Sequence, residues 1–219
     1  MDNTATPHVL IVPYPAQGHI NPMHQFAKRL VNKGVKATLA ITKFISKSMH
    51  AETGKIGVEV ISDGYDDGGF FAAESPDAYL SRFKTVGSET LTEVIKKQES
   101  SGYPVSCVIY DSFCGWALDV AHGFGIQGGS FFTQCCAVNN IYYKCHEGLL
   151  DSPESYASAD PTLPISIPGL PPLTTRDLQS LISVPGYYGA YFDMHLNQFL
   201  NLKNADWIFV NTYKELAGS

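Results

Sequence analysis

The sequence predicts an α/β fold in which a parallel β-sheet is covered by helices on both faces. Short apolar segments without polar alternation recur along the chain, and segments with helical periodicity separate them. Strands are expected at 8–13, 36–42, 57–61, 105–110, 127–132 and 207–211. Helices are expected at 21–33, 76–99, 113–124, 134–147 and 190–204, with a shorter one near 174–182.

The first helix has clear signals at both ends. Asn21 is a suitable N-cap, Pro22 suits the first helical position, and Gly34 is a usual C-terminal residue. His19 is therefore expected in the loop between the first strand and this helix, where a Rossmann-type sheet carries its functional groups. The loop has one glycine instead of Gly-x-Gly-x-x-Gly, so it is expected to present an imidazole and not to wrap a pyrophosphate.

Length, charge and cysteine usage narrow the functional classes. The 219 residues suffice for one large domain, and a net charge of −6 argues against nucleic acid or an anionic membrane as a partner. No apolar run approaches the ~20 residues of a membrane span, and no signal peptide is recognised, so the cytoplasm is the expected location.

Five cysteines without Cys-x-x-Cys or zinc spacing predict free thiols and no metal site. The neighbouring Cys135 and Cys136 could form only a strained disulfide.

Two segments near the C-terminal end stand apart from this pattern. The stretch 150–172 carries six prolines and is expected to be a long loop that shapes a binding site or links parts of the fold. The last residues, 217–219, read Ala-Gly-Ser and are a possible linker or cloning remnant.

A second chemical feature is Asp111, which ends the predicted fourth strand. Strands 1 and 4 become neighbours where the strand order of a doubly wound sheet reverses, so His19 and Asp111 are expected to meet there. The carboxylate would fix the tautomer of the imidazole and leave its other nitrogen as a base. The simpler alternatives are a helix-capping Asp111 and a solvated His19.

No protein nucleophile accompanies this pair. Gly-x-Ser-x-Gly is absent, and Cys114 falls on the helix after the fourth strand. The pair is therefore expected to deprotonate a substrate hydroxyl or a water molecule. Surface positions are expected for four other histidines: His24, His122, His146 and His195.

Several segments together resemble plant UDP-sugar-dependent glycosyltransferases. The resemblance extends from residue 8 to about 216 and looks closest to the glucosyltransferases that act on carboxylates, thiohydroximates or terpenoid alcohols. The matching segments are Pro15-Ala16-Gln17-Gly18-His19-Ile20-Asn21-Pro22, Ile61-Ser62-Asp63-Gly64-Tyr65-Asp66, Val108-Ile109-Tyr110-Asp111-Ser112-Phe113, Trp116-Ala117-Leu118-Asp119-Val120-Ala121, Phe131-Phe132-Thr133-Gln134 and Ile208-Phe209-Val210-Asn211-Thr212-Tyr213.

The resemblance implies a fold of two facing Rossmann-like domains. Residues 1–216 correspond to the N-terminal, acceptor-binding domain, and the signature of the C-terminal UDP-sugar domain is not found. The implied partners are a small-molecule acceptor and a donor-binding part, supplied as the C-terminal domain or by a second chain. UDP-glucose is the implied co-substrate, with no cofactor.

The resemblance also implies roles for individual residues. His19 would remove the acceptor proton, and Asp111 would orient His19. Thr133 and Gly18 would contact the donor sugar, although Thr133 could instead cap the helix that follows. The implied acceptor-binding residues are Gln17, Phe113, Phe132, Tyr191 and Met194.

The leading hypothesis is the acceptor-binding, base-supplying half of an inverting UDP-glucose-dependent glucosyltransferase. One alternative is a catalytically silent module that keeps the acceptor pocket. Another is a small hydrolase in which His19 and Asp111 activate water.

Overall fold

The computed structural model describes residues 6–48, 54–150, 160, 162, 164–184 and 189–212. The chain divides into two compact units, and each is described by itself. The first unit runs to Thr133 and includes Leu202–Phe209, and the second holds Gln134–Asn201 and the residues from Val210 onward. The possible linker at 217–219 and much of the proline-rich stretch lie outside the described residues.

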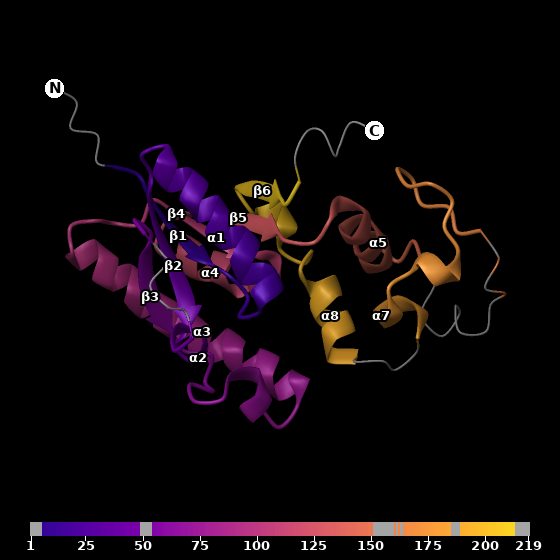
Figure 1. Ribbon diagram of the computed structural model, residues 1–219, viewed down its shortest axis with the longest axis horizontal. Helices are drawn as coiled ribbons and strands as arrows, with labels where there is room; N and C mark the ends of the chain where they lie inside the picture. The colour runs from indigo at the N-terminus through magenta and orange to yellow at the C-terminus, as the bar shows by residue number, and fades with distance from the viewer. Residues whose placement is uncertain are drawn as a thin grey trace. The chain divides into compact units, whose positions relative to one another are not determined.

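The first unit is built on a sheet with the strand order β3-β2-β1-β4-β5-β6. β1 pairs in parallel with both β2 and β4, so the strand order reverses beside β1 (Figure 1). β2 pairs in parallel with β3, and β4 with β5. The strands are β1 (His8–Val12), β2 (Lys36–Thr42), β3 (Gly57–Ile61), β4 (Cys107–Asp111), β5 (Gln127–Phe132) and β6 (Trp207–Val210).

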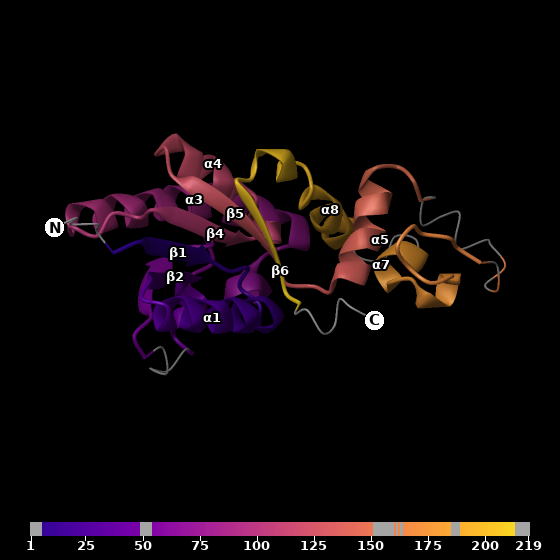
Figure 2. The ribbon, with the colours of Figure 1, turned by 90° about the horizontal axis from the view of Figure 1, so that it is seen from above.

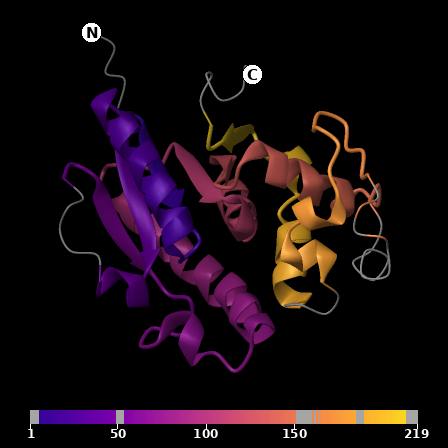
Figure 3. The ribbon, with the colours of Figure 1, turned by 45° about the vertical axis from the view of Figure 1, so that its right-hand side comes forward.

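Helices cover both faces of this sheet. α1 (Gln17–Asn32) lies on one face, and α3 (Pro76–Ser100) and α4 (Trp116–Gly123) lie on the other (Figure 2). Figure 3 shows α1, in indigo, running beside the strands. The unit also contains α2 (Lys43–Ser46) and the 3-10 helices η1 (Gly69–Ala72), η2 (Ser112–Cys114) and η4 (Leu202–Asn204).

The core between α1 and the sheet is apolar because strands and helix bury their hydrophobic faces against each other. Ile11, Leu39 and Ile109 come from three neighbouring strands, and Met23 comes from α1. These side chains are at most 3% exposed. Phe131, on β5, belongs to the same core.

The predicted α/β class and all six strands are confirmed, and three strands match their predicted ranges residue for residue. The predicted start of the first helix is wrong. The helix begins at Gln17 with Ala16 as its N-cap, because the amides of His19 and Ile20 both donate to the Ala16 carbonyl at 2.9 Å. Pro22 consequently lies inside the helix, where it has no N–H to donate, and His19 lies in the first helical turn and not in the preceding loop.

The second unit is helical. It contains α5 (Cys136–His146), η3 (Thr175–Asp177), α7 (Ser180–Ser183) and α8 (Gly189–Asn197), and α8 packs against both α5 and α7. An isolated bridge between Ile165 and Leu173 is the one β pairing in the described part of the proline-rich stretch. The helix predicted at 190–204 is thus divided into α8 and η4.

Candidate active site

His19 and Asp111 reach the same point of the first unit from different elements. β1 ends at Val12, the turn 13–16 follows, and His19 is in the first turn of α1. Asp111 is the last residue of β4, whose Tyr110 pairs with Val12. The His19 Nδ1 atom lies 2.7 Å from Asp111 Oδ2, which confirms the predicted contact.

The Asp111 carboxylate is fully buried, and both of its oxygens have partners. Oδ2 accepts the hydrogen bond from His19, and Oδ1 accepts one from the Phe113 amide at 3.0 Å. Asp111 therefore caps the 3-10 helix η2 and also contacts His19. Because an ionised carboxylate can only accept, His19 Nδ1 carries the proton and Nε2 offers a lone pair.

The imidazole is held inside the unit with one side open. Its side chain is 15% exposed, and Nε2 has no hydrogen-bond partner in the part of the chain that the structure describes. An unpartnered ring nitrogen opposite a carboxylate-bound one is the arrangement of a general base. The site can therefore accept a proton from a molecule that approaches Nε2.

Thr133 ends the first unit directly after β5. Its hydroxyl oxygen lies 3.0 Å from His19 Nδ1, so this nitrogen has a second, longer partner besides Asp111. The alternative of Thr133 as a helix cap is wrong, because the N-cap of α5 is Cys135. Thr133 is instead part of the His19–Asp111 cluster.

Aromatic rings surround the imidazole. Phe113 lies 4.9 Å from it between ring centroids, and Tyr14 lies at 5.4 Å with its ring edge-on. Phe132, on β5, is 4% exposed and belongs to the buried interior of this unit. Tyr14 is a site residue that the sequence analysis did not single out, and its position two residues after a strand and beside prolines carried no signal for it.

Gln17 and Gly18 precede His19 on the exposed start of α1. The Gln17 side chain accepts a long hydrogen bond of 3.5 Å from Asn21. At Gly18, a Cβ atom would meet no heavy atom within 4 Å. The space beside His19 on this side is therefore open.

Tyr191 and Met194 belong to α8 in the second unit. Met194 is 8% exposed, and the Tyr191 carbonyl accepts a hydrogen bond from His195 Nδ1 at 2.7 Å. The predicted surface position of His195 is wrong: the residue is 8% exposed, and its ring lies over Tyr142 with the centroids 4.5 Å apart. Burial here follows from the packing of α8 on α5.

Three of the cysteines are poor nucleophiles because burial raises their pKa. Burial, together with the Asp111 carboxylate, raises the pKa of the Cys114 thiol well above its usual range. Burial also raises the pKa of Cys107 and of Cys145 to about 11.

Within the described ranges, no group of three or more His, Cys, Asp or Glu side chains could hold a metal ion. The same part of the chain has no helix with the length and apolar character of a membrane span.

The chain was compared with protein families, with known proteins and with solved structures. No protein-family model matches the chain. The chain is 49% identical over 210 residues to UDP-glycosyltransferase 74F2 of Arabidopsis thaliana, and this match covers 95% of the chain and 44% of that relative. It is 38% identical over 218 residues to an indole-3-acetate beta-glucosyltransferase of Zea mays, covering 96% of the chain and 46% of the relative.

The solved structure of Os79 from O. sativa in complex with UDP has the same fold. Its TM-score to the chain is 0.82 at 30% sequence identity, and the match covers 95% of the chain and 46% of Os79. The sheet thus matches the N-terminal Rossmann-like domain of the plant UDP-glycosyltransferases. The chain is a homologue of the plant UDP-glycosyltransferases, matches their N-terminal domain, and spans somewhat less than half the length of these relatives.

Proposed function

We propose that this chain is the acceptor-binding, base-supplying half of an inverting UDP-glucose-dependent glucosyltransferase that acts on small plant metabolites. The observation that carries the proposal is the buried Asp111 carboxylate on His19 Nδ1, which leaves Nε2 unpartnered within the described residues. The similarity to the indole-3-acetate beta-glucosyltransferase of Zea mays supports the choice of reaction.

In the proposed reaction, His19 Nε2 takes the proton from an acceptor hydroxyl. The acceptor oxygen attacks the anomeric carbon of the sugar as the bond to the UDP oxygen breaks on the opposite face, which inverts that carbon. Asp111 accepts from Nδ1 throughout and stabilises the imidazolium that forms. The glucoside and UDP are the products, and the proton stays on His19 until solvent removes it.

The roles of the remaining site residues follow from the resemblance to plant UDP-sugar-dependent glycosyltransferases. Gly18 and Thr133 are proposed to contact the donor sugar, and the Thr133 hydroxyl oxygen lies 3.0 Å from His19 Nδ1. The acceptor-binding set is Gln17, Phe113, Phe132, Tyr191 and Met194. The groups that bind the rest of UDP are proposed to lie on a donor-binding part, either a C-terminal domain or a second chain. Five free cysteines favour the cytoplasm as the compartment.

The experiment joins this chain to the part of UDP-glycosyltransferase 74F2 that it does not match. Binding of UDP and of a phenolic acceptor is measured first, and glucoside formation is then followed. We expect the fusion to transfer glucose to the acceptor. His19→Ala should lower kcat for the hydroxyl acceptor about 10²–10⁴-fold, because general-base catalysis typically contributes a rate factor of this size. The kcat for a carboxylate acceptor should fall much less, because a carboxylate is already ionised at neutral pH.

Two outcomes decide against the proposal. A fusion that binds both substrates and forms no glucoside supports the catalytically silent acceptor-binding module. Equal losses of kcat for both acceptor classes in His19→Ala would show that His19 does not act as the base.

A further inference from the structure

Three aromatic rings meet at the catalytic end of the first unit. The ring of Tyr14 lies edge-on to His19, with centroids 5.4 Å apart and planes at 64°. Phe113 lies 4.9 Å from His19 and 5.7 Å from Tyr14. Each ring therefore touches the other two, and the imidazole forms one corner of a closed triangle.

Tyr14 is itself held in place by the core. Its side chain is 8% exposed, and its ring packs on Phe83 of α3 at 6.3 Å. Phe83 is 2% exposed and packs in turn on Trp116 of α4 at 5.3 Å. The Tyr14 carbonyl also accepts the Ala16 amide at 2.7 Å, which fixes the backbone of the turn. Tyr14 can move only if the aromatic packing between α3 and α4 moves with it.

The hydrogen-bond partners of His19 do not by themselves fix its orientation. Asp111 and Thr133 both contact Nδ1, so the ring can still tilt about this one atom. A tilt displaces Nε2, at the far side of the ring, and a base must lie within about 2.6–3.2 Å of the proton-bearing oxygen to act. Ring contacts away from Nδ1 are what oppose such a tilt.

We infer that Tyr14 is a positioning residue, whose ring, together with that of Phe113, holds the His19 imidazole so that Nε2 keeps one orientation. This inference rests on the proposed function of His19. The ring of Tyr14 carries the effect, since it is the ring that contacts the imidazole.

The first test uses the 219-residue chain and needs no activity. Histidine side chains are labelled with ¹⁵N, and the His19 signals are identified by their loss in His19→Ala. In the unchanged chain and in Tyr14→Phe we expect a sharp Nδ1–H signal and an unprotonated Nε2. In Tyr14→Ala the Nδ1–H signal should broaden as the ring tilts and its proton exchanges with water. An unchanged His19 signal in Tyr14→Ala would overturn the inference.

The second test measures kcat and KM in the fusion described above. Tyr14→Ala should lower kcat for a hydroxyl acceptor about 10–100-fold, with a smaller loss for a carboxylate acceptor and KM within about twofold, because small misplacements of a reacting group cost up to about 10² in rate. Tyr14→Phe keeps the aromatic ring and should have the kcat of the unchanged fusion. Tyr14→Leu keeps the apolar volume, covers the case in which Tyr14→Ala does not fold, and should retain the selective loss.

Controls separate the possible failures. Tyr103 is an exposed aromatic residue outside the site, and Tyr103→Ala should change neither kcat nor the His19 signals. Equal losses of kcat for both acceptor classes in the Tyr14 variants would indicate general damage and overturn the inference, as would a Tyr14→Phe variant as impaired as Tyr14→Ala. If His19→Ala shows no hydroxyl-selective loss, the proposed function fails, while the ring signals still report whether Tyr14 orients His19.

Discussion

At the residue scale, the histidine that begins β1 and the histidine in the first turn of α1 have different roles. His19 follows the carboxyl end and has one unpartnered nitrogen within the described residues. His8 begins the strand, is 1% exposed, and uses both ring nitrogens: Nδ1 donates to the Tyr103 carbonyl at 2.9 Å, and Nε2 accepts from the Thr38 hydroxyl at 2.8 Å. His8 is therefore a structural residue that is buried in its neutral form.

The burial of His8 predicts a pH dependence of stability. Burial lowers the pKa of His8 below its ordinary value of 6.5. The unfolded chain then binds a proton that the folded chain does not, so stability present above pH 6.5 is lost as the pH falls toward the folded-state pKa. Urea unfolding at several pH values should show a decreasing free energy of unfolding in this range. His8→Gln should flatten the decrease, and an identical slope in this variant would contradict the prediction.

Gly18 offers a test of the proposed donor side. Ala is favoured over Gly in a helix by up to about 1 kcal/mol, and its Cβ would meet nothing within 4 Å in this chain, so Gly18→Ala should unfold at the same or a higher temperature. In the fusion enzyme we expect kcat/KM for UDP-glucose to fall about tenfold or more, since overfilling a packed site costs about 1–3 kcal/mol.

Gly123 provides the matched control, because it ends α4 and its Cβ would also meet nothing within 4 Å. Gly123→Ala should leave kcat/KM unchanged. Transfer that is unaffected by Gly18→Ala would remove Gly18 from the donor site.

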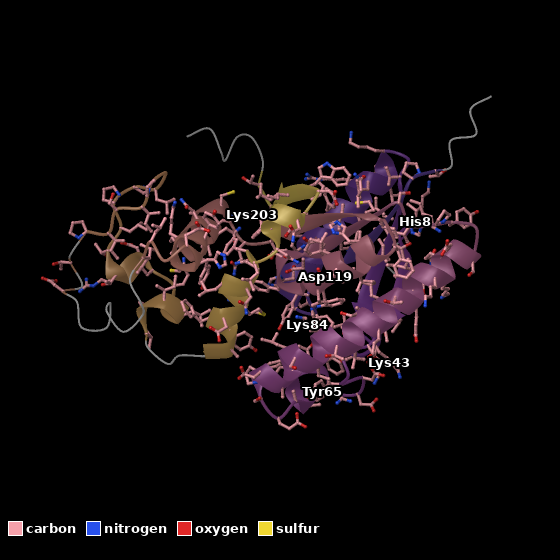
Figure 4. The ribbon with its side chains drawn as sticks, turned by 180° about the vertical axis from the view of Figure 1, so that it is seen from behind. His8, Lys43, Tyr65, Lys84, Asp119 and Lys203 are labelled. Carbon is pink, nitrogen blue, oxygen red and sulfur yellow. The ribbon has the colours of Figure 1, made fainter. Side chains whose placement is uncertain are left out.

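At the element scale, the loop after β3 is tied to α3 through a buried carboxylate. Asp63 is 1% exposed; its Oδ2 accepts from the Tyr79 hydroxyl at 3.0 Å, and its Oδ1 accepts from the Tyr65 amide at 2.9 Å. Ser75 caps α3 by accepting from the Ala78 amide at 3.1 Å. Lys43 and Tyr65 lie at this end of the unit, away from His8 (Figure 4). These contacts fix the start of the helix that carries Phe83.

Removal of the Tyr79 hydroxyl should therefore weaken the first unit. Burial and the nearby Asp63 raise the pKa of Tyr79, so its hydroxyl stays a neutral donor. Tyr79→Phe is expected to cost about 1.5–3 kcal/mol in the free energy of unfolding, the range for a hydrogen bond to a charged group. Chemical denaturation measures this loss. Tyr103→Phe, on a side chain that is 58% exposed, is the control and should change stability little; equal values for the two variants would contradict the assignment.

At the scale of the whole molecule, the chain carries the proposed base, and most of the donor site is proposed to lie on a separate donor-binding part. Gly18 and Thr133 are the described residues proposed to contact UDP-glucose, and none is proposed for the uracil, ribose or diphosphate. The net charge of −6 also opposes the approach of a nucleotide-sugar anion. Catalysis by the isolated chain would therefore lack the groups that stabilise the leaving diphosphate.

The corresponding prediction concerns the 219-residue chain alone. Calorimetry with UDP-glucose should give a dissociation constant weaker than about 1 mM, equivalent to about −4 kcal/mol of binding free energy. No glucoside should form in the absence of a donor-binding part, whereas the fusion should bind the nucleotide sugar. Micromolar binding, or product from the chain alone, would show that the donor site has been misplaced.

The sequence by itself determined the sheet, the alternation of strands and helices, and the meeting of His19 with Asp111. Apolar runs and helical periodicity are local properties, and the carboxyl ends of two neighbouring parallel strands come together whatever the rest of the chain does. The helix start was mispredicted because Asn21 and Pro22 are good starting residues by propensity, and the amides of His19 and Ile20 find the Ala16 carbonyl one turn earlier.

The tertiary structure alone decided what surrounds the base. The contact between Tyr14 and Phe83 joins residues from the first loop and from α3, so it depends on how the helix packs on the sheet and leaves no periodic trace in the sequence. The burial of His195 likewise depends on the packing of α8 against α5. Local patterns set which elements form, and the free energy of packing between distant elements sets which side chains meet.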